Sequence, residues 1–112
     1  MSLQRNPADI TILSGATASS SFTTGCAIRG SFQIPVAFTL TAATITVNVS
    51  NDGSTWTACP VEGAEVNPIT GVVVGGTYSL PVKAFSFRYL QLVAGTAQAA
   101  ARTITMYSRD DG

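Results

Sequence analysis

Residues 44–57 read TITVNVSNDGSTWT, and this stretch decides the fold. From Ile45 to Val49, apolar residues alternate with polar ones, which is the pattern of a strand that buries one face. Asn51–Ser54 then supplies turn chemistry, because short polar side chains bond the nearby backbone and a glycine is free to take positive φ. Thr55–Thr57 resumes the extended pattern and contains the one tryptophan of the chain. The stretch therefore predicts a β-hairpin with an aromatic anchor.

On both sides of this hairpin, short segments of strand character alternate with Gly- and Pro-rich turns. Ser20–Thr24 is too polar to assign, and Gly30 is a candidate bulge site. The segment 84–93 has apolar residues on both faces over part of its length, which is typical of a central strand. With no sustained helical period, the pattern predicts an antiparallel sandwich or barrel. The predicted strands are residues 9–13, 26–34, 38–50, 55–59, 69–74, 77–80, 84–93 and 101–108.

The composition is unusually poor in charge. Charged residues make up 11% of the chain, against about 25% in an average soluble domain. Six basic and six acidic residues give a formal net charge of zero, which argues against a protein that binds nucleic acid through its phosphates. A weakly charged surface suits a face that a partner later buries. On composition alone, an assembly component and a small neutral domain with no such role stay equally open.

The 112 residues are expected to form one domain. Met1–Ala8 is predicted to be an extended arm, because it is polar and Pro7 blocks a helix. Residues 9–109 are predicted to form a single β-sandwich, and residues 110–112 a polar tail. The first residues have no apolar stretch typical of a secretory signal, and no run approaches the ~18 apolar residues of a membrane span. We therefore expect a protein made in a cytoplasm, with no membrane partner.

No set of residues in the sequence indicates a catalytic or metal site. The chain has no histidine, which removes Ser-His-Asp catalysis and the commonest metal ligand. Cys26 and Cys59 alone do not form a zinc site, and they are expected to be buried thiols, with a disulfide as the less favoured alternative. Glu62 and Glu65 lie in a predicted loop, and Asp52 lies in the hairpin turn. A glycosidase needs two carboxylates across a cleft, whereas loop carboxylates beside Gly and Pro are mostly solvated. We therefore expect no enzymatic activity and no cofactor.

Two groups of side chains leave a binding role open. The aromatic group could form a platform for a sugar, although packing in the core or at its rim is the favoured interpretation. The strand arginines either extend outward into solvent or pair with carboxylates of a partner subunit. The aromatic group is Trp56, Tyr78, Tyr89 and Tyr107, and the arginines are Arg29, Arg88 and Arg102.

Three segments carry a resemblance to known proteins. They are SNDGSTWT (residues 50–57), GAEVNPITGVVVGGTYSLP (residues 63–81) and FRYLQLVAGTAQAAARTITM (residues 87–106). With these segments the chain resembles virion proteins of tailed bacteriophages. It is similar to the head-decoration proteins, also called cement or staple proteins, of short-tailed phages. The resemblance spans Ala37 to Ser108.

The resemblance implies a jelly-roll-like antiparallel β-sandwich of about eight strands with an extended N-terminal arm. It also implies a virion protein that binds the outer surface of the assembled capsid and bridges neighbouring major capsid subunits. The implied oligomer is a homodimer or homotrimer. The arm is then expected to order on binding and to contact the capsid through Leu3, Arg5, Pro7 and Ile10. The alternative function is a tail, host-adsorption or carbohydrate-binding module.

Overall fold

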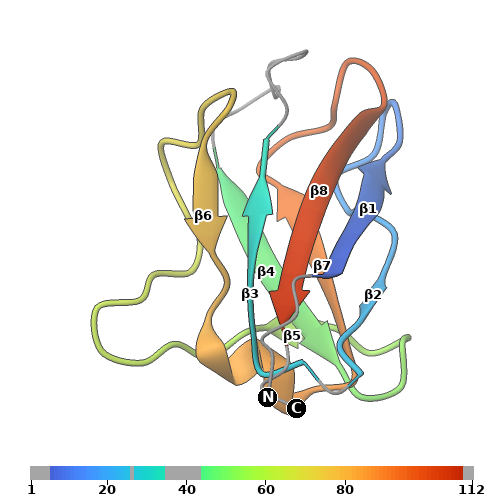
Figure 1. The fold of residues 1–112 in the computed structure, drawn as a ribbon. Coiled ribbons are helices and arrows are strands. Elements are labelled where there is room, and N and C mark those ends of the chain that lie inside the picture. The colour runs from blue at the N-terminus through green and yellow to red at the C-terminus, as the bar shows by residue number, and fades with distance from the viewer. Residues whose placement is uncertain (1–5, 26, 35–43, 110–112) are drawn as a thin grey trace.

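The computed structural model describes residues 6–25, 27–34 and 44–109, which form a two-layer β-sandwich (Figure 1). The first sheet has the strand order β1-β8-β3-β6 and the second sheet the order β2-β7-β4-β5. All the pairings between these strands are antiparallel. The strands are β1 (Asn6–Ile12), β2 (Phe22–Thr23), β3 (Arg29–Gln33), β4 (Ile45–Ser50), β5 (Thr57–Ala58), β6 (Thr77–Ser79), β7 (Tyr89–Ala94) and β8 (Arg102–Arg109). A 3-10 helix, η1 (Val82–Ser86), precedes β7.

The sheet order shows that the chain is one long hairpin, rolled up. Strands β4 and β5 form the tip, and the pairs β3–β6, β2–β7 and β1–β8 follow in turn along the two arms. The pairs β3–β8 and β4–β7 join different parts of this ribbon to each other. This nesting is the topology of a jelly roll, which confirms the predicted fold class. The stretch 44–57 lies at its tip.

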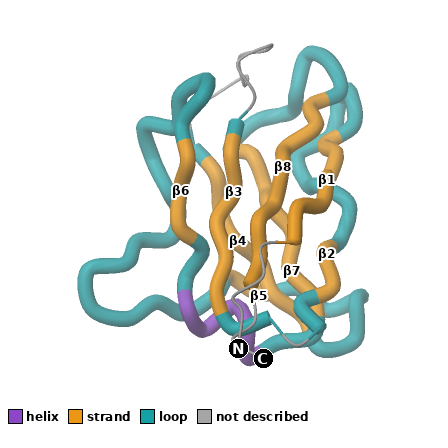
Figure 2. Tube along the Cα trace, viewed as in Figure 1, coloured by secondary structure: helices purple, strands orange, loops and turns teal. Residues whose placement is uncertain are grey.

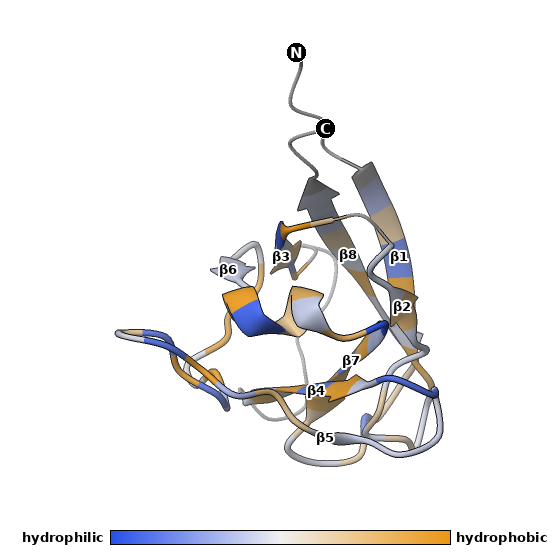
Figure 3. Cartoon of the chain, turned by 90° about the horizontal axis from the view of Figure 1, so that it is seen from below, coloured by the Kyte–Doolittle hydropathy of each residue, from blue (hydrophilic) through white to orange (hydrophobic). Residues whose placement is uncertain are grey.

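The core lies between the sheets, because every long strand buries alternate residues. In β4 the buried apolar side chains are Ile45, Val47 and Val49, as the sequence predicts. Leu90 and Leu92 of β7 are fully buried beside them. Figure 3 shows the two layers from below, with η1 across one end, where it contacts both β3 and β4. Figure 2 shows that loops make up most of the chain outside the two sheets.

The predicted central strand 84–93 is wrong in its first half. Residues Val82–Ser86 form η1, and only Tyr89–Ala94 is a strand. The strand also buries one face and not two, since Leu90, Leu92 and Ala94 are buried and the residues between them are half-buried. A long-range contact explains the change: Glu65 Oε2 accepts a hydrogen bond from the Val82 N–H (3.0 Å) at the start of η1.

The predicted strand 69–74 is also wrong. Ile69 makes a single bridge to Ile45, and the valines that follow lie in a loop, with Val73 59% exposed. Gly71 and Gly75 take positive φ on either side of the valines, which turns the chain out of extended geometry. The short strand β2 lies within the segment that was too polar to assign.

Gly30 is not at a bulge, because β3 pairs with β8 without a skipped residue on either side of it. A Cβ at this position would lie 2.8 Å from the Tyr107 carbonyl oxygen and 2.8 Å from Phe85 Cζ. The glycine therefore allows a close approach of β3 to β8 and η1.

The first strand begins earlier than predicted. β1 starts at Asn6 and not at Asp9, so Pro7 and Ala8 belong to the sheet and not to an arm. Proline is tolerated there because β1 is an edge strand. The predicted segment 38–41, residues 1–5, Cys26 and residues 110–112 lie outside the described residues.

Candidate binding surfaces

The hairpin loop at the tip of the roll is ordered by its own side chains. Asp52 Oδ1 accepts hydrogen bonds from the N–H groups of Ser54 and Thr55 (both 2.8 Å) and from the Ser50 hydroxyl (2.8 Å). The Ser50 oxygen in turn accepts from the Gly53 N–H (2.9 Å), and Gly53 has φ +80°. These bonds hold the pKa of Asp52 well below its usual range. The predicted turn chemistry is confirmed, but strand pairing resumes only at Thr57.

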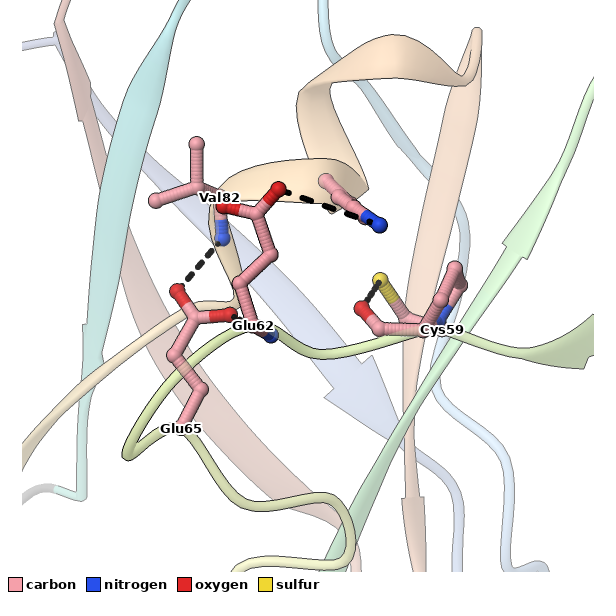
Figure 4. A network of polar contacts seen from close by, with 6 residues as sticks. Cys59, Glu62, Glu65 and Val82 are labelled. Atoms are coloured by element: carbon pink, nitrogen blue, oxygen red, sulfur yellow. Dashed lines mark hydrogen bonds and ion pairs between the residues drawn. The ribbon is translucent and has the colours of Figure 1, made fainter.

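A second carboxylate clamps the loop between β5 and β6 to the rest of the molecule (Figure 4). Glu65 Oε1 accepts from the Glu62 N–H (2.9 Å), while its other oxygen accepts from Val82. These backbone bonds, that from Val82 first, lower the pKa of Glu65. Glu62 is exposed and forms an ion pair with Lys83 at 3.8 Å. The two glutamates therefore hold a loop in place, and the pKa shift of Glu65 is opposite to the rise that a general acid needs.

Asn67 fixes the far side of the same loop. Its side-chain NH₂ donates to the carbonyls of Val47 (2.9 Å) and Cys59 (3.0 Å), and its oxygen accepts from the Val47 N–H (2.9 Å). The side chain thus takes the place of a neighbouring strand beside β4. This role could not be predicted from the sequence, because Asn67 and Val47 are 20 positions apart.

Cys59 packs under this loop with a free, buried thiol, which confirms the preferred prediction for this residue. Its Sγ–H donates to the Pro60 carbonyl (3.2 Å). Burial and, next, the negative charge of Glu65 raise the pKa of the thiol to about 11. The side chain is therefore a neutral part of the core at physiological pH.

The solvent-facing side of the first sheet is broad and nearly uncharged. Because Ile10, Phe32 and Met106 point into the core, the alternate residues of their strands point outward. We call this surface the outer face. Asp9 and Arg29 supply its charges among the residues whose side chains are described. It consists of Pro7, Asp9, Thr11, Arg29, Ser31, Gln33, Thr77, Ser79, Thr103, Thr105 and Tyr107.

Three shallow grooves open on the described surface. One of about 500 Å³ and one of about 270 Å³ adjoin at the end of the sandwich, where both include Asn51 and Phe87. The third, of about 220 Å³, lies between the loop at 64–69 and β6, and its lining includes Val66 and Tyr78. We call it the β6 groove.

The aromatic side chains do not form one platform. Tyr78 points into the sandwich and contacts Phe32, with ring centroids 5.5 Å apart, whereas Tyr107 lies on the outer face of the same sheet. Tyr89 lies on the other sheet, with the Arg88 guanidinium 5.6 Å from its ring centroid. Trp56 is half-buried in the hairpin loop and does not line these grooves. The favoured interpretation, packing in the core or at its rim, holds for Tyr78, whereas Tyr107 lies on the solvent-facing side of the same sheet.

The arginines lie at strand ends and not inside strands. Arg29 and Arg102 are the first residues of β3 and β8, and Arg88 immediately precedes β7. Arg29 and Arg88 are exposed, and Arg102 is half-buried.

The four predicted contact residues have different positions. Leu3 and Arg5 lie outside the described residues, and Pro7 is exposed on the outer face. Ile10 is 2% exposed and belongs to the core, so its side chain cannot reach a partner. The prediction for Ile10 is corrected by the alternation of β1, which turns this residue inward between two outward neighbours.

The described residues include neither a membrane-spanning helix nor a metal-binding cluster. No helix there is long and apolar enough to cross a membrane. No group of three or more Cys, Asp or Glu side chains there is arranged to hold a metal ion.

The fold and these surfaces define a small jelly-roll β-sandwich protein. The SPBc2 prophage-derived protein YomS has a similar crystal structure, with a TM-score of 0.57 and 12% identity over 96% of both chains. A chain from the Bacillus endospore appendages, a family of disulfide-linked pili, has a TM-score of 0.48 at 21% identity, covering 96% of this chain and 87% of that one. The first likeness shows a shared fold. No protein-family model and no curated protein sequence matches this chain.

Proposed function

We propose that this chain is a non-enzymatic structural protein of a phage particle. In this proposal it binds the outer surface of the assembled capsid and bridges neighbouring major capsid subunits. The outer face of the first sheet is the observation that carries the proposal. It offers eleven outward residues on four adjacent strands, and uncharged hydroxyl, amide and phenol groups dominate it. Such a face can be covered by a protein surface with little cost of burying charge.

Two further observations support a phage setting. The fold is shared with a prophage-derived protein, and the sequence segments at 50–57, 63–81 and 87–106 resemble head-decoration proteins. The chain enters the first sheet at Asn6, so Leu3 and Arg5 precede a strand that borders the proposed docking face. Many copies, each bridging subunits, would stabilise a shell because opening it must break several contacts at once.

The proposal is tested by cosedimentation of the purified protein with capsids of the parent phage prepared without it. We expect saturable binding and a higher temperature of shell disruption. Gln33→Lys puts a charge on the outer face and should weaken binding at least about tenfold. Asn48→Lys is the matched control, because Asn48 is also a half-buried amide on a strand between two neighbours, but on the other sheet.

Absence of saturable binding to capsids would overturn the proposal. If Gln33→Lys and Asn48→Lys weakened capsid binding equally, the outer face would be rejected as the docking surface. A second pair of variants, Leu3→Ala and Arg5→Ala, then measures the contribution of the N-terminal segment. Each should weaken binding less than Gln33→Lys, since each removes one side chain and adds no buried charge.

The adjoining grooves at Asn51 and Phe87 favour one other function, the binding of a carbohydrate during host adsorption. They combine an amide and hydroxyls with aromatic rings, which is the chemistry that recognises sugars. Direct binding of host-surface glycans that is lost in Asn51→Ala would support this alternative. Glycan binding that is unchanged in Asn51→Ala, or no binding, would reject these grooves as the site.

A further inference from the structure

Strand β6, at one edge of the first sheet, presents a row of backbone groups that have no hydrogen-bond partner among the described residues. Leu80 N–H donates to the Gly30 carbonyl (2.9 Å), and Ile34 N–H donates to the Gly76 carbonyl (3.0 Å). In an antiparallel pair alternate residues face the neighbour, so the even-numbered residues of β6 bond to β3. Thr77 and Ser79 therefore point their N–H and C=O groups away from the sheet. Within the described part of the chain, these four groups make no hydrogen bond.

The side chains along this edge do nothing to block it. Thr77 and Ser79 are both exposed and uncharged. The row ends at Pro81, which has no N–H and whose carbonyl accepts from Ala84 (3.0 Å). Natural proteins commonly protect an open edge with charges, proline or a covering segment. Among the described residues, none of these protects the outward groups of Thr77 and Ser79.

Apolar surface lies beside the free edge on its inner side. The β6 groove, of about 220 Å³, separates Tyr78 from Val66, which is 60% exposed. The Tyr78 hydroxyl accepts from the Val73 N–H (2.8 Å), so the ring is held at the groove wall. Glu65 also lines the groove, but its carboxylate is engaged by two backbone N–H groups. The groove therefore suits an uncharged, apolar neighbour.

We propose that β6 pairs with β6 of a second copy of this chain, antiparallel, about a twofold axis at Tyr78. In this register Thr77 lies opposite Ser79 of the second copy, and Ser79 lies opposite its Thr77. Each opposed pair exchanges two hydrogen bonds, so all four free groups of each chain are satisfied. The first sheets of the two copies then form one continuous sheet of eight strands.

A second copy suits this edge better than an arbitrary strand, because the edge is complementary to itself. The two outward residues lie symmetrically about Tyr78, so a twofold axis there places each of them opposite the other residue of the second copy. No charged residue lies on the free edge, and the chain has a formal net charge of zero, so two copies do not repel each other. The β6 grooves of the two copies also meet near the axis, where each covers apolar surface of the other.

The interface is small, since each copy contributes three strand residues and one groove. Contacts below about 1,200 Å² are typical of transient association, so we expect a reversible dimer with a dissociation constant in the micromolar to millimolar range. A dimer of this kind would give the protein two outer faces on one sheet.

Analytical ultracentrifugation of the full chain, over a concentration series reaching the millimolar range, tests this dimer without any capsid. We expect a monomer–dimer equilibrium for the natural sequence. Thr77→Lys with Ser79→Lys should raise the dissociation constant at least about tenfold, because four like charges then meet in the interface. Thr57→Lys with Ala58→Lys is the matched control on β5, the exposed edge of the second sheet, and should leave the equilibrium unchanged.

Amide hydrogen exchange tests the register. The N–H groups of Thr77 and Ser79 should become protected as concentration rises, while that of Asp9 on β1 should not. Ser79→Pro should weaken the dimer, because it removes two of the four intermolecular bonds and none of the bonds to β3. Thermal melting checks that each variant folds.

A monomer at every concentration would overturn the proposal, as would a dimer that survives the β6 lysine pair. Protection absent from Thr77 and Ser79 in a dimer would also overturn it. These measurements use the isolated protein, so their outcome is independent of whether capsids bind.

Discussion

The two edges of the first sheet are built in opposite ways. At β1, Pro7 removes one outward N–H, Asp9 places a charge on the edge, and Ser20 covers Thr11 by donating to its carbonyl (3.0 Å). At β6, the outward backbone groups of Thr77 and Ser79 have no partner in the part of the chain that the structure describes. The first sheet therefore has one edge, β1, that is protected against the addition of a further strand, and one edge, β6, that lacks this protection among the described residues. In the proposed dimer, this difference would confine strand pairing between copies to the β6 edge.

The largest expected effect comes from removing the side chain that anchors β6 to the core. Phe32 is fully buried and contacts Tyr78, so Phe32→Ala should lower the free energy of unfolding by about 3–5 kcal/mol. Only three residue pairs join β6 to β3. Hydrogen exchange at the Leu80 amide should therefore accelerate more in Phe32→Ala than exchange at the Ile10 amide on β1. Urea unfolding and amide exchange measure both.

Phe22→Ala is the control for this change, because Phe22 is half-buried on β2 of the other sheet. Phe22→Ala should lower the free energy of unfolding by less than Phe32→Ala does, and it should leave the amide hydrogen exchange of Leu80 unchanged. Equal acceleration at Leu80 and Ile10 in Phe32→Ala would contradict the view that β6 is the more weakly held edge.

A smaller loss is expected from Gly30→Ala, which disturbs the strand between β6 and β8. The new Cβ would lie 2.8 Å from the Tyr107 carbonyl oxygen, and backbone in a paired strand cannot move away freely. We expect a loss of about 1–3 kcal/mol in the free energy of unfolding, measured by urea. Gly95→Ala is the control, since its nearest neighbour would be at an ordinary 3.5 Å and it should be nearly neutral. Similar losses for both variants would reject the close approach as the reason for Gly30.

Acid should loosen the loop beside the β6 groove. The pKa of Glu65 is lower in the folded protein than in the unfolded chain, where it is about 4.5. Its stabilisation is therefore present above that unfolded value and is lost as pH falls through the folded value. The melting temperature of Glu65→Gln should lie below that of the natural protein at pH 7, and the gap should narrow below about pH 4.

Glu62→Gln is the control for this pH dependence, because it removes only an exposed ion pair with Lys83. It should have a small effect on the melting temperature at pH 7. If the difference in melting temperature between Glu65→Gln and the natural protein stayed constant across the acid range, the charge of the Glu65 carboxylate would not be what holds the loop.

The smallest effect on stability should come from removing the protection of β1. Pro7→Ala with Asp9→Thr restores an outward N–H and removes the charge, at a cost below about 1 kcal/mol. Made in a chain whose β6 is already blocked by Thr77→Lys and Ser79→Lys, it should create new association in the ultracentrifuge. Continued monomeric behaviour would mean that Pro7 and Asp9 are not what keeps β1 closed.

Much of the fold could be predicted from residues that act on their near neighbours. The alternation in β4 and the bonds of Asp52 within the hairpin loop involve positions a few residues apart, so pattern and turn chemistry were enough to find them. The predicted strands at 77–80 and 101–108 are confirmed to within one residue at each end for the same reason.

The candidate site was less predictable, because its parts come from distant segments. Tyr78 was singled out for its ring, but its position at the β6 groove depends on Val66 and on the loop at 71–73. Ile10 was expected to contact a partner, but the alternation of β1 turns it inward, and only the packing of the second sheet against the first shows which face of β1 is covered.

By itself, the sequence determined an all-β domain, a hairpin at 44–57 and a surface with little charge, because alternation, turn residues and composition are local properties. Only the tertiary structure decided that residues 82–86 form a helical turn, that Asn67 substitutes for a strand, and that β1 and β6 are the edges of one sheet. These outcomes depend on hydrogen bonds and packing between residues far apart in the chain. Such contacts exist only once the ribbon has rolled up, and their energy then outweighs the local preference of each segment.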